Sequence, residues 1–194
     1  MSVRLAEAED HRELTRVLSR AFDDDPIQRW VFPSARLRSR YGGEFFRWSL
    51  WRCAGHRLTW TTEDLAGAAL WMLPDQWQVS VSQLARLVRW AAPGVWRRGP
   101  LIMWGLTTVE RRHPGDGHLY LSVLGVDPAR QGSGLGSALL APGLELCDRE
   151  GIPAYLETGK ECNLAFYGRH GFRVMGDLRL PAGPPVWLMR RAPR

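Results

Sequence analysis

Lysine is nearly absent from this chain: Lys160 is the only lysine among 26 Lys and Arg residues. The formal net charge is nevertheless +6, with a sequence pI of about 9.9. A basic surface of this kind can attract nucleic acid. No helix-turn-helix, zinc-finger or RNA-binding motif accompanies the arginines, so we expect no nucleic-acid partner.

Cysteine is also scarce. The three cysteines, Cys53, Cys147 and Cys162, show no C-x-x-C spacing, which argues against a disulfide framework and against a metal site. Residues 1–7 hold no apolar signal core, and no run approaches about 18 apolar residues. These absences predict a cytoplasmic chain with no membrane partner.

The remaining composition is ordinary for a globular protein, with 45% hydrophobic and 24% charged residues. The length of 194 residues, without an internal repeat or a long linker, predicts a single domain over residues 1–194.

The most informative segment is residues 120–137. An apolar strand over 120–126 runs into a turn at Asp127-Pro128, followed by glycines at 132, 134 and 136 and a helical run from about Ser137. Glycines allow consecutive backbone N–H groups to converge, and the helix brings the positive end of its dipole to the same point. This order of strand, glycine-rich loop and helix predicts a backbone site (an anion cradle) that binds a phosphate or pyrophosphate.

The spacing distinguishes this loop from two other phosphate loops. The dinucleotide fingerprint needs G-x-G-x-x-G, whereas the glycines here run G-x-G-x-G, and the triphosphate loop needs a lysine that this segment lacks. A glycine-rich turn without any ligand remains the alternative interpretation of the loop taken alone.

The sequence after the predicted helix adds to the pattern. Residues 154–158 are typical of a strand, and Gly171-Phe172 starts another. Between them, Asn163 and Tyr167 are four residues apart and share one helix face. Asn163 is also a favourable N-cap for that helix.

Together, Gln131-x-x-Gly134-x-Gly136, the strand ending in Leu156-Glu157-Thr158, and the Asn163 and Tyr167 pair resemble the GNAT superfamily of acyl-coenzyme A-dependent N-acyltransferases. Within it, the second half of the chain is most similar to the puromycin N-acetyltransferases, while residues 34–112 hardly match. The resemblance implies an α/β fold: a mixed, twisted sheet of six or seven strands flanked by helices. It also implies acetyl-coenzyme A as cofactor, held by Leu124, Gly125, Val126, Gln131, Gly132, Ser133, Gly134, Leu135, Gly136, Ser137, Asn163 and Tyr167.

Amine acetylation needs groups in three roles: donors that polarise the thioester carbonyl, an acid that protonates the departing thiolate, and a base that accepts the proton of the amine. Backbone N–H groups around residues 124–126 are suited to polarising the thioester carbonyl and to pairing with the pantetheine amides. The resemblance makes Tyr167 the general acid for the departing thiolate. Two candidates for the base remain open: Glu157, on the strand beside the cradle strand, and His118, which shares a strand face with Tyr120.

The rest of the chain predicts the other elements. We expect a strand at 3–5, helices at 8–22, 34–54, 80–91 and 100–112, a hairpin of 57–61 with 65–73, and a final strand pair of 172–180 with 186–189. Gly42-Gly43 predicts a bend in the second helix.

The acceptor is expected to be a primary amine of a small molecule, and the assembly a monomer or homodimer. Nine of ten tryptophans lie at or before Trp104, and a few of them are expected to line an acceptor pocket. The resemblance to puromycin N-acetyltransferases favours an antibiotic such as an amino-nucleoside, and hence antibiotic resistance. Acetylation of protein N-termini or lysines, and a sensor that binds acyl-coenzyme A without turnover, are the alternatives.

Overall fold

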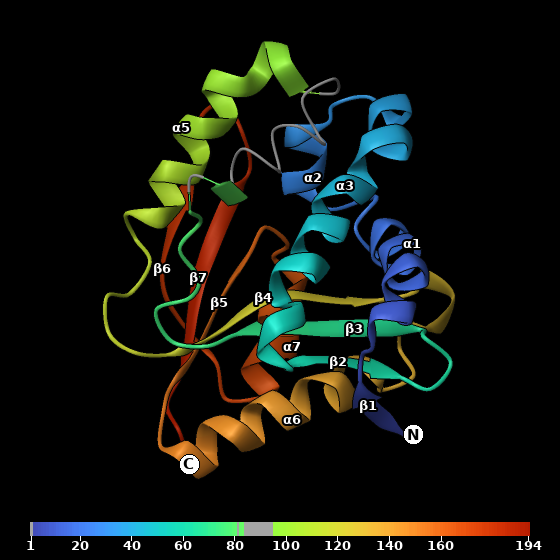
Figure 1. Cartoon of the computed structure of the whole chain (residues 1–194). Helices are drawn as coiled ribbons and strands as arrows, with labels where there is room; N and C mark the ends of the chain where they lie inside the picture. The colour runs from blue at the N-terminus through green and yellow to red at the C-terminus, as the bar shows by residue number, and fades with distance from the viewer. Residues whose placement is uncertain (1, 81, 84–94) are drawn as a thin grey trace.

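The computed structural model describes residues 2–80, 82–83 and 95–194. A seven-stranded sheet runs through them in the order β1-β2-β3-β4-β5-β7-β6 (Figure 1). Its strands are β1 (Val3–Leu5), β2 (Thr59–Thr62), β3 (Gly67–Met72), β4 (Leu119–Val126), β5 (Ala154–Thr158), β6 (Arg173–Arg179) and β7 (Pro185–Arg191). Only β4 and β5 pair in parallel, so the sheet is mixed, as the GNAT resemblance implies.

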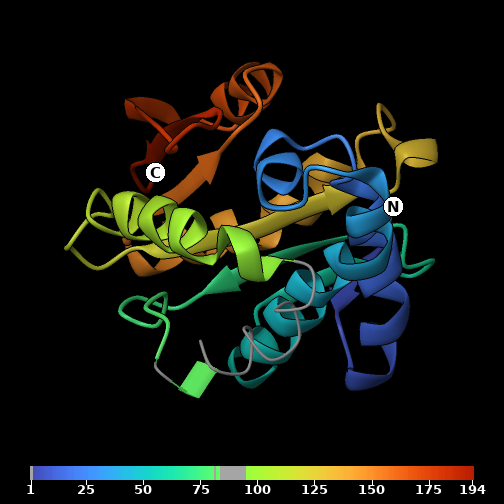
Figure 2. The same cartoon turned by 90° about the horizontal axis from the view of Figure 1, so that it is seen from above.

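Helices cover both faces of the sheet. One face carries α1 (His11–Ala21), α2 (Pro26–Val31), α3 (Ala35–Cys53) and α5 (Gly99–Glu110), and the other carries α6 (Leu135–Glu150) and α7 (Cys162–Arg169). In the view from above, α5 and α2 lie in front of the strands (Figure 2). Short 3-10 turns occupy Ala8–Asp10, Ala54–His56, Trp96–Arg98 and Pro128–Arg130.

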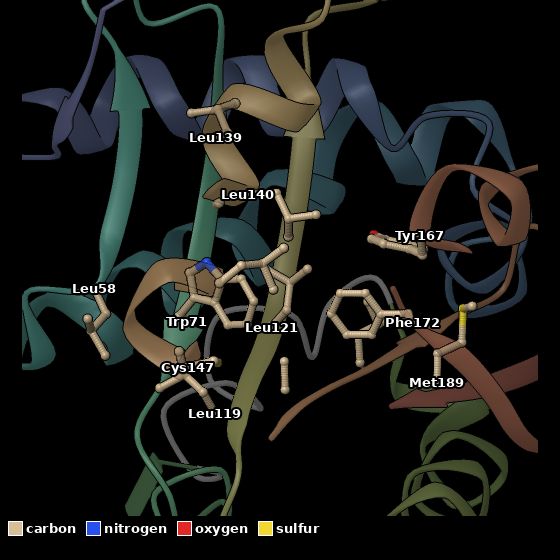
Figure 3. Close-up of a cluster of buried hydrophobic side chains, with 14 of the residues drawn as sticks. Leu58, Trp71, Leu119, Leu121, Leu139, Leu140, Cys147, Tyr167, Phe172 and Met189 are labelled. Atoms are coloured by element: carbon tan, nitrogen blue, oxygen red, sulfur yellow. The ribbon is translucent and has the colours of Figure 1, made fainter. Parts of the chain in front are cut away.

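The helix sequences explain this arrangement. In α1, Leu14, Val17, Leu18 and Ala21 recur at helical spacing, and all four are buried against the sheet and α3. In α6, Leu135, Leu139, Leu140 and Leu144 form the stripe that covers the opposite face, where Leu139 and Leu140 lie near Trp71 (Figure 3).

A β-bulge in β4 reverses the direction of its side chains. Leu121 pairs with Trp71 and Val123 with Leu70, so Ser122 is the extra residue between them. Before the bulge, Leu119 and Leu121 join the core under α6; after it, Val123 joins the core under α1 and α3.

Strands β4 and β5 separate soon after they begin to pair. Their parallel register covers Leu119, Leu121 and the residue between them against residues 154–156 of β5. Beyond this point, β4 pairs with β3 and β5 pairs with β7. The sheet therefore opens into a gap between residues 122–126 and residues 157–158.

Most predicted elements are confirmed, and the differences have physical causes. Helix α3 runs unbroken through Gly42-Gly43, so the predicted bend is absent. The missing side chain at Gly43 lets Ser19 of α1 approach, since a Cβ there would be 3.1 Å from Ser19 Oγ. Helix α6 begins at Leu135, two residues earlier than predicted, and the short helix α2 was not predicted. The predicted helix over 80–91 lies outside the described residues except at 80 and 82–83, of which 82–83 are helical.

Packing between α6 and the sheet depends on one glycine. Any Cβ at Gly143 would collide with the Trp71 ring, which is fully buried on β3. The helix can therefore approach the sheet closely only where a side chain is missing.

We expect Gly143→Ala to lower the free energy of unfolding by about 1–3 kcal/mol, because the core has no room for the methyl group. Gly42→Ala is the matched control: its Cβ would meet nothing within 4 Å in the interior of α3, so it should be neutral or stabilising by about 0.5–1 kcal/mol. Urea unfolding of both variants measures the difference. Equal stability of the two would contradict this account of the packing.

Candidate active site

The cradle after β4 is formed by backbone rather than by side chains. Gly132 and Gly134 have φ values of 77° and 86°, a left-handed conformation that favours glycine. Gly134 is the N-cap of α6 and supplies no capping side chain. At α2, by contrast, Asp25 accepts hydrogen bonds from two first-turn amides, and at α3 Ser34 accepts one. The first-turn amides of α6 are thus left to a ligand.

The polar side chains of the cradle have partners within the protein. Gln131 Nε2 donates to the Val126 carbonyl at 3.1 Å, and Ser133 Oγ donates to the Arg130 carbonyl at 2.6 Å. Ser137 Oγ lies 2.9 Å from His170 Nε2, which ties the start of α6 to the end of α7. These three predicted cofactor-binding residues therefore shape the loop, and the amides remain as its anion-binding groups.

The glycines of the cradle differ in how much room lies beside them. A Cβ at Gly132 or Gly134 would meet nothing within 4 Å, so both positions face open space. Gly136 lies closer to its surroundings, since a Cβ there would be 3.3 Å from the Phe166 ring. Converging amides, an uncapped helix N-terminus and open space together fit the pyrophosphate of coenzyme A.

The gap between β4 and β5 exposes backbone polar groups beside the cradle. Along an antiparallel pair, alternate peptide groups point away from the partner strand. For residues 124–126, which pair with β3 on one side, those groups face the gap where β5 has departed. This is where Leu124, Gly125 and Val126 were expected to act.

Tyr167 reaches this region from α7. Its side chain points toward β4 (Figure 3) and is 7% exposed, with its ring 5.8 Å from that of Phe172. Within the described part of the chain its hydroxyl has no recorded hydrogen-bond partner. Burial, together with the nearby carboxylate of Asp25, raises the pKa of Tyr167. The phenol therefore keeps its proton at neutral and moderately alkaline pH.

Asn163 does not cap α7, which corrects the sequence interpretation. The helix begins at Cys162 with Glu161 as N-cap, and the Asn163 amide instead donates to Thr158 Oγ1 at 3.2 Å. Asn163 thus connects α7 to the end of β5, beside the gap. The neighbouring Lys160 forms an ion pair with Asp24.

The two candidate bases belong to one hydrogen-bond network on the other face of the sheet. Glu157 Oε1 lies 3.1 Å from His113 Nδ1, and His113 Nε2 lies 2.9 Å from His118 Nε2. The Tyr120 hydroxyl donates to Glu157 Oε2 at 2.7 Å. The sequence had presented Glu157 and His118 as separate alternatives, whereas the structure joins them through His113.

Sequence reasoning missed His113 because its role depends on a turn. His113 and His118 flank the segment Pro114-Gly115-Asp116-Gly117, which folds back so that the two rings meet. A histidine pair around a Pro- and Gly-rich turn is the only local signal that could have indicated it.

An aromatic ring covers the network. Trp77 stacks on the His113 ring with 3.7 Å between the ring centroids. Arg52 of α3 holds the Trp77 segment by donating to the carbonyls of residues 76, 77 and 78. Only 3% of the His113 side chain and 12% of the Glu157 side chain are exposed, so the network is largely shielded from water.

This shielding shifts the pKa values of His118, Tyr120 and Tyr155. Burial lowers the pKa of His118, which keeps the ring neutral near pH 7. Burial and the charge of Glu157 raise the pKa of Tyr120 and of Tyr155. The Tyr155 hydroxyl is buried without any recorded partner in the described structure. It lies on the same strand face as Glu157, and its ring centroid is 4.6 Å from that of His113.

Tyr167 and Glu157 approach the gap from opposite faces of the sheet. Tyr167 packs in the core under α6 and α7, whereas Tyr155, on the Glu157 face, packs under α2 and α5. Tyr167 and Glu157 therefore come from different layers of the fold and meet at the gap between β4 and β5, where Asp25, the N-cap of α2, also lies near Tyr167. Among the described residues, no cluster of His, Cys, Asp and Glu could hold a metal ion, and no helix is long and apolar enough to cross a membrane.

Comparisons with known proteins find similar acetyltransferases. Residues 103–172, from α5 to the end of the α7 region, match the Acetyltransferase (GNAT) family. An uncharacterized N-acetyltransferase of Schizosaccharomyces pombe is 28% identical over 209 residues, covering 100% of this chain and 84% of that protein. The mycothiol acetyltransferase of Mycobacterium avium is 36% identical over 100 residues, which cover 46% of this chain and 31% of that protein.

The fold has similar solved structures. The crystal structure of a histone acetyltransferase HPA2 and related acetyltransferase from Corynebacterium glutamicum has a TM-score of 0.74 and 24% sequence identity, covering 100% of this chain and 96% of that chain. The match over residues 103–172 and the relatives support an acetyl-coenzyme A-dependent acyltransferase, and the similar structures show the same fold.

The cradle generates a prediction for coenzyme A binding. Alanine disfavours the φ of 86° at position 134, so the free loop of Gly134→Ala should relax to another conformation. Returning to the cradle conformation on binding then costs about 1–2 kcal/mol, and the affinity for coenzyme A should fall roughly tenfold. Gly151→Ala is the matched control, because it introduces the same kind of strain at the other end of α6, where φ is 66°. Titration calorimetry with coenzyme A measures both. An equal loss of affinity in the two variants would contradict the cradle.

Proposed function

We propose that this acyltransferase moves the acetyl group of acetyl-coenzyme A to a primary amine of a small molecule. The observation that carries the proposal is the gap between β4 and β5, which has the glycine cradle at its end, Tyr167 on one face and Glu157 on the other. One 194-residue domain would then contain the whole site.

The part of the site that binds the amine must first remove a proton from it. An alkyl amine has a pKa of about 10 and enters as an ammonium ion, which is not nucleophilic. Glu157, held by Tyr120 and His113 and largely shielded from water, is placed to attract the ammonium and to accept its proton directly or through water. The buried, unpaired Tyr155 hydroxyl lies on the same strand face and can hold that water or the amine nitrogen.

Acetyl-coenzyme A, when bound, supplies an activated acyl group as a thioester. Amides of residues 124–126 that face the gap donate to the carbonyl oxygen, on which negative charge develops during attack. Helix α6 contributes the positive end of its dipole to the cradle. These backbone groups are fixed before the reaction, so they need little reorganisation.

Tyr167 completes the reaction on the opposite face. Its raised pKa keeps the hydroxyl protonated until a basic thiolate forms nearby, and the phenol then donates its proton to the sulfur.

Aromatic side chains around Glu157 favour a small, partly apolar acceptor. Tyr120 and Tyr155 adjoin the carboxylate, and Trp77 stacks on the neighbouring His113. Trp30 packs in the same cluster as Tyr155 and donates to the Pro181 carbonyl. Rings of this kind attract organic cations and apolar groups. Together with the similarity of the second half to puromycin N-acetyltransferases, they support an amino-nucleoside or another antibiotic amine, and therefore resistance, in a cytoplasmic monomer or homodimer.

Release of free thiol from acetyl-coenzyme A, followed with a chromogenic disulfide, tests the function. The panel contains puromycin, arylalkylamines, a polyamine, and peptides with a free N-terminus or a lysine. We expect release with one or more of the small amines. Release with peptides alone would replace the proposal by protein acetylation, and coenzyme A binding without any release would replace it by a sensor.

Tyr167→Phe should lower kcat about 100-fold, since general acid catalysis typically contributes about 10²–10⁴-fold, while the Kd for coenzyme A changes less than about twofold. Because burial raises the pKa of Tyr167, we also expect no loss of wild-type kcat from tyrosine ionisation as pH rises through about 10. Tyr41→Phe, on α3, is the control. An unchanged kcat in Tyr167→Phe would remove its role.

A further inference from the structure

The two edge strands of the sheet differ in length and in how their charges are engaged. At one edge, β1 has only three residues, and its Arg4 is paired with Asp10 and Glu63. At the other edge, β6 has seven residues and pairs with β7 alone (Figure 1). A long edge strand offers unpaired backbone groups to another strand, whereas a short or charge-blocked strand does not. Strand β6 is therefore the edge that is open to a partner.

The register of β6 on β7 shows which backbone groups face outward. The Leu180 amide donates to the Pro184 carbonyl, so these two residues form a hydrogen-bonded pair. Because such pairs alternate along an antiparallel ladder, Leu178 bonds to β7, whereas the N–H and C=O groups of Asp177 and Arg179 point away from it. Within the described part of the chain, these outward groups have no recorded hydrogen-bond partner. Each of the two residues thus presents a donor and an acceptor along the free edge.

Apolar side chains are exposed at the same end of the sheet. Helix α5 packs on β6, since Leu101 and Ile102 share a buried cluster with Leu178 and Leu180. Exposed apolar side chains that gather in one region mark an interaction surface. Of the eight large apolar side chains that are exposed among the described residues, six lie on β6, on α5 or on the turn before α5: Trp96, Met103, Trp104, Leu106, Val174 and Met175. This surface suits a protein partner that supplies both a strand and an apolar face.

A second copy of this chain can supply that strand. Two antiparallel copies of β6 use all these outward groups when residue 177 of one copy lies opposite residue 179 of the other. Leu178 then lies on the two-fold axis, and Asp177 faces Arg179 of the partner subunit once on each side of the axis.

The neighbouring registers are unfavourable. With residue 177 opposite its own copy, two carboxylates would meet, and Arg179 would lie opposite the β-bulge at Met175. With residue 179 opposite its own copy, two guanidinium groups would meet, and Asp177 would lie opposite Pro181, which has no N–H. Opposite charges directly across an antiparallel pair stabilise it, and like charges destabilise it.

The charges on this edge are available for such pairing. Both Asp177 and Arg179 are exposed. No ion pair of either residue is recorded within the described ranges, and Arg179 contacts the Gly183 carbonyl at 3.4 Å.

We propose that β6 pairs with β6 of a second copy of this chain in an antiparallel, two-fold symmetric dimer, in which Asp177 pairs with the partner subunit's Arg179. The two sheets become one continuous sheet, and α5 of each copy lies near the axis because it packs over Leu178. This inference selects the homodimer from the two assemblies expected from the sequence. It does not depend on the proposed function, since β7 and β5 separate the interface from the gap beside β4.

Charge reversal tests the pairing. Asp177→Arg and Arg179→Asp each place like charges opposite each other in both pairs, so each should raise the dissociation constant of the dimer about 10- to 100-fold. The double variant exchanges the signs and should dimerise like the wild type. An equimolar mixture of the two single variants should form a mixed dimer, because every pair then joins Arg with Asp. This recovery would also show that both variants are folded.

Glu145→Arg is the matched control, because it makes the same change of charge at an exposed position of α6, away from β6. Its dissociation constant should equal that of the wild type. Sedimentation equilibrium over about 1–100 μM protein measures the mass, which should rise from the 22.0 kDa of one chain toward twice that value. Hydrogen exchange at the Asp177 and Arg179 amides should slow as the protein concentration rises.

Three results would overturn the proposal. The first is a wild-type mass of one chain at all these concentrations. The second is wild-type dimerisation of both single variants, or no mixed dimer from their mixture, since either result would contradict the pairing of Asp177 with Arg179. The third is a dimer whose Asp177 and Arg179 amides exchange as fast as in the monomer, because the contact would then lie elsewhere on the surface.

Discussion

The separation of β4 from β5 is the constraint on which the site depends. Parallel pairing ends after Leu121 and Leu156, and each strand then continues with a different antiparallel neighbour. Backbone groups that a continuous sheet would use internally become available along β4. A gap of this kind is stable only because β3 and β7 hold the two strands from the outside, and because α6 and α7 cover one face while α2 and α5 cover the other.

Two local irregularities make the separation useful. The bulge at Ser122 changes which side chains of β4 face each layer, so that Tyr120 joins the Glu157 network while Val123 joins the core under α1. The left-handed glycines after β4 then direct the chain into α6 with its first-turn amides open. Tyr167 and Glu157 consequently reach the same opening from separate layers, each in its own environment.

The sequence predicted what depends on local signals. Strands β1 and β5 have the predicted bounds, and the cradle loop was recognisable because glycine spacing and the following apolar helix lie within one short segment. Glu157 and His118 were identified by their residue types and strand faces. The hydrogen-bond network that joins them was not predictable, because His113, the turn at 114–117 and the ring of Trp77 must meet in space to form it. Asn163 shows the converse: a residue favourable for capping was used for a tertiary contact with Thr158 instead.

The scarcity of lysine has a chemical consequence for a protein that binds an acyl thioester. An enzyme that binds a reactive thioester is itself exposed to acylation, and a lysine ε-amino group is one of the side chains that can take the acyl group, as a stable amide. Here nearly every cation is a guanidinium, which stays protonated and is a poor nucleophile. The single ammonium side chain is engaged by Asp24. The molecule thus offers its own donor almost no competing amine, and its positive surface is chemically inert toward the group that it transfers.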